Sequence, residues 1–161
     1  MAADSILPIA LGSSVPSASA GALAGLLGMR IEVTSAAGTK AYRVVKAGGA
    51  LSTIGNAVLV SALDANNAPT WVVNTTTTAA SPYGGVAVTS QVALSTGDYF
   101  LLQVAGPAQV ISQAAIAAGA YIGSSTVAKQ VVTSTNGTAI GAAVVAAGAG
   151  GATIAANLFA S

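Results

Sequence analysis

Turn-forming residues interrupt this sequence at short, nearly regular intervals from residue 29 onward, and this spacing limits what the chain can fold into. The runs between the turns are short and rich in valine, isoleucine and threonine, which favour β-strands. Many short strands separated by turn chemistry predict an all-β fold, either an antiparallel β-sandwich or a small β-barrel. The expected strands are 30–34, 40–45, 57–63, 71–77, 86–94, 99–104, 109–112, 120–122, 127–133, 139–145 and 152–159.

Two dipeptides predict turns at specific positions. Asn136-Gly137 is a strong hairpin signal and predicts a hairpin that joins Val131-Val132 to 139–145. Gly106-Pro107 is also a turn signal, so 99–104 and 109–112 are expected to be separate strands. The alanine-rich runs 113–118 and 142–147 are too short for stable helices and predict single turns at most.

The chain divides by composition near residue 28. Residues 1–28 form a nonpolar N-terminal arm of alanine, serine, glycine and leucine with two prolines. We expect this arm to be extended, or to contain a short helical turn within 20–28, where Gly21 and Gly25 disfavour a longer helix. A neighbouring subunit or the arm's own domain would have to hold it. Residues 29–161 are expected to form a single β-rich domain.

Charge is unusually scarce. Only 6% of the 161 residues are charged, whereas about a quarter are charged in an ordinary soluble domain. The mean hydropathy of +0.75 suits a membrane protein, but polar and turn residues break every apolar stretch, so no membrane-spanning helix is expected. Ala18-Ser19-Ala20 resembles a signal-peptidase site, yet no basic residue precedes it, so no signal peptide is expected.

The residues that usually carry catalysis are scarce as well. The chain has no histidine and no cysteine, which excludes the commonest general base and the thiol nucleophile. Its carboxylates are widely spaced, and Asp64 and Asp98 are interpreted as turn residues. No nucleophile, phosphate-binding or metal-binding motif is present. We therefore expect no enzymatic activity, no catalytic residue, no cofactor and no metal.

Four of the five basic residues lie between positions 30 and 46, namely Arg30, Lys40, Arg43 and Lys46, with Glu32 as the one opposing charge. Four cations are few for a nucleic-acid site, because affinity there grows with the number of phosphates neutralised. Two interpretations remain open, a solvated strand face and a contact to an acidic protein surface.

Four segments resemble recurring elements of the capsid decoration, or cement, proteins of tailed bacteriophages. They are 97–110 (GDYFLLQVAGPAQV), 119–122, 136–144 and 152–159. The likeness covers roughly residues 29–161 and is best from Gly97 onward. It implies a small β-rich protein, often a homotrimer, on the outer capsid surface of the virion. Its implied partners are the major capsid protein and itself, and no cofactor comes with it. From the residues themselves, no nucleic-acid or membrane partner is expected.

The leading hypothesis is therefore a structural virion protein that stabilises a phage capsid by clamping adjacent major capsid subunits. The expected contact residues are apolar ones of the arm, with Arg30, Lys40, Arg43 and Lys46 as polar contacts. The apolar set is Ile6, Leu7, Ile9, Leu11, Leu23, Leu26 and Leu27.

The alternative is another phage surface or tail module, or a carbohydrate-binding β-sandwich. Aromatic platforms for sugars would then come from Trp71, Tyr83 and Tyr121. Trp71 lies among β-branched neighbours, which favours a position in the core instead.

Overall fold

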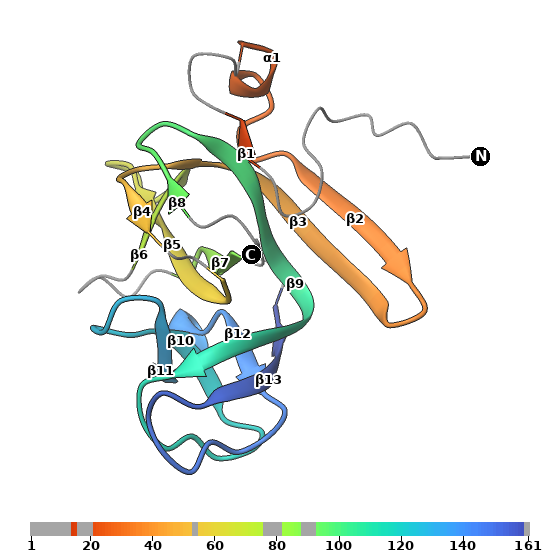
Figure 1. Ribbon diagram of the computed structural model, residues 1–161, viewed down its shortest axis with the longest axis vertical. Coiled ribbons are helices and arrows are strands. Elements are labelled where there is room, and N and C mark those ends of the chain that lie inside the picture. Colours follow the sequence, from red (N-terminus) through yellow and green to blue (C-terminus); the bar gives the residue numbers. More distant parts are fainter. Residues whose placement is uncertain (1–13, 16–20, 53–54, 76–81, 88–92, 160–161) are drawn as a thin grey trace.

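The computed structural model describes residues 14–15, 21–52, 55–75, 82–87 and 93–159, and its fold is all-β. Eleven strands form one mixed sheet and two more form a separate pair (Figure 1). The expected short helical turn is α1 (Gly21–Ala24). The strands are β1 (Ser14–Val15), β2 (Arg30–Ser35), β3 (Gly38–Ala47), β4 (Leu51–Ser52), β5 (Ala57–Leu63), β6 (Pro69–Thr75), β7 (Gly84–Ala87), β8 (Ala93–Leu94), β9 (Tyr99–Ser112), β10 (Tyr121–Ser124), β11 (Gln130–Thr133), β12 (Gly141–Ala143) and β13 (Thr153–Leu158).

The first half of the sheet closes on itself. β3, β9, β7, β5 and β6 pair in sequence around a ring, and a short parallel pairing of β6 with β3 completes it. Closure leaves no free sheet edge within this ring. β2 pairs antiparallel with β3 outside the ring and forms a hairpin that projects from the barrel (Figure 1).

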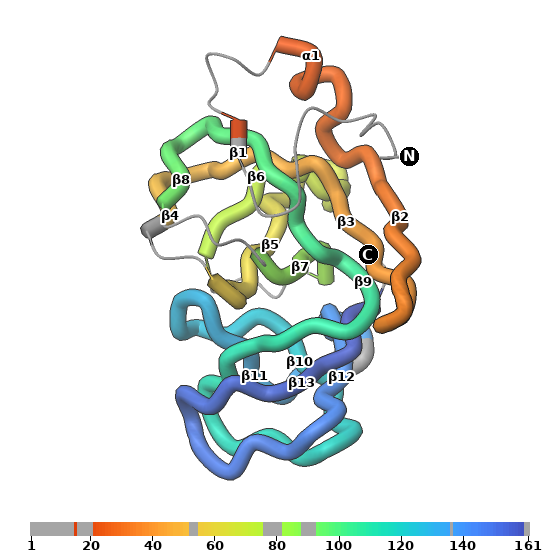
Figure 2. Tube along the Cα trace, turned by 45° about the vertical axis from the view of Figure 1, so that its right-hand side comes forward, coloured from red at the N-terminus to blue at the C-terminus, as the bar shows by residue number. Residues whose placement is uncertain are grey.

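The second half closes in the same way. β9 continues into a second ring with β13, β12, β10 and β11, and a parallel pairing of β11 with β9 completes it. The molecule is thus two small barrels that share one long strand, and Figure 2 shows β9 running from one barrel into the other. The all-β prediction is confirmed, although the two closing pairs are parallel where antiparallel pairing was expected.

The shared strand bends where the sequence suggested a turn. β9 is continuous through Gly106-Pro107, so the two strands expected on either side of this dipeptide are one. Gly106 has a φ of 88°, which glycine adopts without steric cost. The chain therefore changes direction here without leaving the sheet, and the expectation of a turn was wrong.

Three apolar clusters stabilise this arrangement. One fills the first barrel around Phe100 and Leu102. A second fills the other barrel around Ile122, and it includes Val58 and Val86 from the first barrel, so the two barrels pack together. The third covers the outer face of the first barrel, where Leu23 of α1 packs with residues of β3 and β9.

The sequence predicted where strands lie better than it predicted which strands pair. Asn136-Gly137 lies in a 3-10 turn (Asn136–Thr138), and β10 lies between β11 and β12, so the expected hairpin was wrong. β10 pairs antiparallel with both neighbours, and this non-local pairing closes the barrel. The strand expected to begin at residue 127 begins at 130, because Lys129 has a φ of 70°.

The strand expected at 86–94 is also divided. Its ends belong to β7 and β8, which lie in different sheets, and residues 88–92 lie outside the described part of the chain.

Several other expectations are confirmed. β5 has the predicted bounds, and neither alanine-rich run is helical. Asp64 Oδ1 accepts hydrogen bonds from the backbone N–H groups of Asn66 and Ala68, and Asp98 Oδ2 accepts one from Ser95, as turn residues do. Across the described ranges, no helix has both the length and the apolar character needed to cross a bilayer.

Candidate functional site

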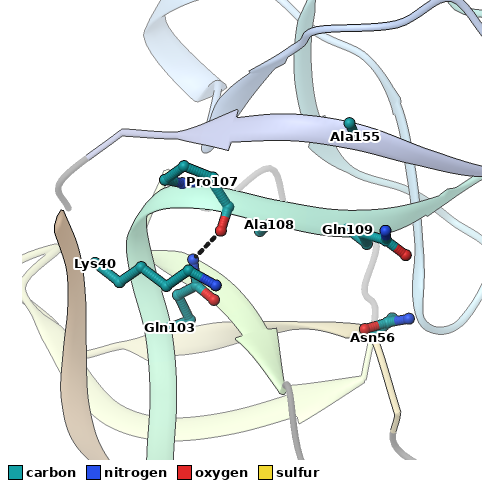
Figure 3. A pocket seen from close by; sticks show the side chains of 7 residues that line it. All are labelled: Lys40, Asn56, Gln103, Pro107, Ala108, Gln109 and Ala155. Atoms are coloured by element: carbon teal, nitrogen blue, oxygen red, sulfur yellow. Dashed lines mark hydrogen bonds between the residues drawn. The ribbon is translucent and has the colours of Figure 1, made fainter. Parts of the chain in front are cut away.

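A pocket of about 400 Å³ lies where the two barrels meet (Figure 3). Lys40 enters it from β3, Asn56 precedes β5, and Ala155 comes from β13. The rest of the lining comes from β9 on both sides of its bend. The full lining is Lys40, Asn56, Gln103, Pro107, Ala108, Gln109 and Ala155. Both barrels therefore build this site.

The buried polar group of the pocket is Gln103, which is 1% exposed. Its Nε2 donates hydrogen bonds to the carbonyl oxygens of Pro107 at 2.8 Å and Ala105 at 3.3 Å. These two acceptors settle the orientation of the amide, because its nitrogen must face them. Its Oε1 is buried and has no hydrogen-bond partner in the described part of the chain. A buried acceptor without a donor is uncommon in folded proteins and requires an explanation.

The structure gives the four predicted cations different surroundings. Arg30 forms an ion pair with Glu32 at 2.8 Å. Arg43 donates a hydrogen bond to the Gly28 carbonyl at 2.7 Å and lies 4.4 Å from the centre of the Trp71 ring. The Lys46 ammonium lies 5.8 Å from the centre of the Tyr99 ring. Three of the four cations therefore have partners in their own chain.

Lys40 is the remaining cation and lines the pocket. It is half-buried, and no ion pair, hydrogen bond or ring contact engages its ammonium within the described ranges. The expected cationic patch is thus reduced, at this site, to one lysine beside a buried amide (Figure 3).

The predicted arm contacts divide into two groups. Ile6, Leu7, Ile9 and Leu11 lie outside the described residues. Leu23, Leu26 and Leu27 pack on the outer face of the first barrel, and Leu23 is only 2% exposed. The described part of the arm is therefore held by its own domain, and a role of the arm in partner contacts stays a prediction.

The three candidate sugar platforms do not gather in one place. Trp71 and Tyr83 form an edge-to-face pair at 6.2 Å, whereas Tyr121 pairs with Phe159 at 5.8 Å in the second barrel. Trp71 is half-buried against the first core, and the Arg43 guanidinium lies over its ring.

Burial shifts the pKa of two side chains on β3. Desolvation raises the pKa of Tyr42. Desolvation also lowers the pKa of Arg43, and the charge of Arg30 lowers it further. These two arginines are direct cross-strand partners in the β2–β3 hairpin. Among the described residues, no three acidic side chains come together in a way that could hold a metal ion.

The surface of the second barrel is nearly free of charge. Between residues 113 and 159, Lys129 is the one charged residue. Five of the eight large apolar side chains that the described surface exposes lie in this same stretch. They are Tyr121, Val127, Val144, Val145 and Phe159.

No protein-family model and no curated protein sequence matches this chain. The solved structures with a similar fold include one from a bacteriophage. It is the N base of the head fiber gp8.5 of bacteriophage phi29, with a TM-score of 0.46 and 13% sequence identity. The match covers 81% of this chain and 95% of that chain.

Sequence reasoning missed three polar residues of the pocket, Asn56, Gln103 and Gln109. One signal was available, because Gln103 interrupts the most apolar run of the chain just before Gly106-Pro107. A glutamine within an apolar run, close to a proline, indicates a polar side chain that the core keeps for a hydrogen bond.

Proposed function

We propose that the protein is a structural, non-enzymatic component of a bacteriophage head. In this proposal it binds the outer surface of the shell as a homotrimer and clamps neighbouring major capsid subunits. The segments that resemble decoration proteins support this, and the lack of histidine and cysteine agrees with a role without catalysis.

The observation that carries the proposal is the surface of the second barrel. It exposes Val144 at 59%, Val145 at 55% and Tyr121 at 41%, with Lys129 as the one charge in residues 113–159. Val144 and Val145 are also neighbours in the chain, and exposed apolar side chains that gather on a folded protein often mark an interaction site. Covering such surface contributes about 25 cal/mol for each Å² removed from water, before the costs of association.

The two-barrel architecture is consistent with this role. Because both rings close, the strands present few free edges, and affinity would come from side chains on a rigid face. A clamp gains from rigidity, since less conformational entropy is lost when it binds.

Purified virions test the proposal. We expect quantitative mass spectrometry to find the chain at many copies per particle, and antibody labelling in electron microscopy to place it on the head. Analytical ultracentrifugation of the isolated protein should show a trimer. Absence of the chain from purified virions would contradict the proposal, and a monomer at high concentration would contradict the trimer.

A further inference from the structure

The pocket where the two barrels meet has the chemistry of a binding site for a negatively charged peptide segment. We propose that it receives an acidic side chain carried on an extended segment of the shell protein. This inference rests on the proposed function and names the contact by which the protein would recognise its partner.

The charge of the pocket argues for an acidic ligand. Its seven lining residues include one cation, Lys40, and no acid. The other cations of β2 and β3 are engaged by Glu32, Gly28, Trp71 and Tyr99, as described above. A carboxylate placed at Lys40 would form a charge-assisted hydrogen bond, which is stronger than a neutral one.

The buried oxygen of Gln103 argues for a ligand that also donates a hydrogen bond. Oε1 is an acceptor only, and its own amide nitrogen is already bound to Ala105 and Pro107. Figure 3 shows the end of the Lys40 side chain next to this amide. An acidic residue in an extended peptide supplies both groups together, a carboxylate for the lysine and a backbone N–H for the glutamine.

The remaining walls suit a main chain. Asn56 and Gln109 present amides that both donate and accept, and Pro107, Ala108 and Ala155 are small and apolar. The volume of about 400 Å³ far exceeds the roughly 30 Å³ that one water molecule occupies. It falls within the range of about 300 to 1,000 Å³ that is usual for ligand pockets.

The test follows the side-chain NH₂ signals of Gln103 by ¹⁵N–¹H NMR on the full chain. The probes are acetyl-Gly-Glu-Gly-amide and its neutral analogue acetyl-Gly-Gln-Gly-amide. We expect a saturable shift of the Gln103 signals with the acidic peptide, and at least about tenfold weaker binding of the neutral one. If neither peptide moves the Gln103 signals, the pocket does not bind an extended acidic segment and the inference is wrong.

Two matched variants test whether Lys40 is the cation that binds the acidic peptide. Lys40→Gln should weaken binding of the acidic peptide by about tenfold, because it removes the pocket cation. Lys46→Gln makes the same change on the same strand, but its ammonium lies over the Tyr99 ring, so binding should be unchanged. Equal affinity of the wild type and Lys40→Gln would overturn the inference.

Occupancy on heads separates this inference from the proposed function. If the wild type decorates heads and Lys40→Gln does so at the same copy number, the pocket is not the shell contact and the proposed function stands. If the wild type is absent from heads, the proposed function is wrong and the shell contact falls with it. The peptide titration then still decides whether the pocket binds an acidic segment.

Discussion

The Nε2 atom of Gln103 donates a hydrogen bond of 2.8 Å to the carbonyl oxygen of Pro107, across the bend where β9 passes between the barrels. Pro107 has no backbone N–H and pairs with Asn157 of β13 in unbroken register, so its carbonyl oxygen is its only backbone hydrogen-bonding group. The same amide also binds the Ala105 carbonyl at 3.3 Å. One buried side chain thus ties together both sides of the bend that Gly106 permits.

Replacing Gln103 should therefore destabilise the fold. Gln103→Leu leaves the Ala105 and Pro107 carbonyls without their donor, and we expect a loss of about 1–3 kcal/mol in the free energy of unfolding. Urea denaturation measures this loss. Gln109→Leu makes the same change at an exposed position of the same strand and should cost less than about 0.5 kcal/mol. Equal losses in the two variants would show that the Gln103 amide bonds do not stabilise the bend.

The backbone at Gly106 should tolerate no side chain. Its φ is 88°, and a Cβ there would overlap the Thr39 carbonyl oxygen. Gly106→Ala should lose about 1–2 kcal/mol from the left-handed conformation and about 1–3 kcal/mol more from the clash.

Gly119→Ala is the control for Gly106→Ala. Gly119 has a φ of 79°, but a Cβ at this residue would have no atom within 4 Å, so only the conformational cost applies. Thermal unfolding should show a larger fall in Tm for Gly106→Ala, and an equal fall would contradict the close approach of β3 and β9.

Arg43 should hold the segment after α1 against the first barrel. Arg43→Lys removes the fork that reaches the Gly28 carbonyl and the planar group over Trp71. Since Trp71 is the one tryptophan of the chain, its fluorescence reports this site directly. We expect a changed emission spectrum for Arg43→Lys. Arg30→Lys, on the exposed ion pair with Glu32, should leave emission as in the wild type; identical spectra for all three proteins would refute the role of Arg43.

Tyr42 should make stability depend on alkaline pH. Burial raises the pKa of Tyr42 in the folded protein, whereas the pKa of a tyrosine in an unfolded chain is about 10. The contribution is therefore fully present below the unfolded pKa and is lost as the pH rises through the folded pKa. Urea unfolding at about pH 8 and about pH 11 should show a smaller loss for Tyr42→Phe than for the wild type. A loss of the same size in both would mean that Tyr42 titrates alike in the two states.

The sequence predicted strands well and their partners poorly. Ala57–Leu63 was recognised because its apolar residues and the flanking turn at Asp64 are local signals. The pairings that close each ring, β6 with β3 and β11 with β9, join segments far apart in the chain, and no local pattern encodes them. Asn136-Gly137 shows the same limit, because a local hairpin preference yielded to the position of β10 between its neighbours.

The candidate site was predicted only in part. Arg30, Lys40, Arg43 and Lys46 are close in sequence, but their contacts depend on which barrel face each strand position occupies. A bulge in the pairing of β3 with β9 between Ala41 and Tyr42 shifts this alternation. The pocket needs residues of both barrels, so it exists only after the whole sheet has closed.

The copy number of variants on purified heads tests the central claim most directly. Val144→Asp places a charge on the apolar face of the second barrel, where Val144 is 59% exposed, and Leu63→Asp makes a comparable change on the first barrel, where Leu63 is 38% exposed. Burying an unpaired carboxylate is costly, so Val144→Asp should reduce copies per head by at least about tenfold while Leu63→Asp retains the wild-type number. Wild-type occupancy of Val144→Asp would contradict the claim that this face is covered on the virion.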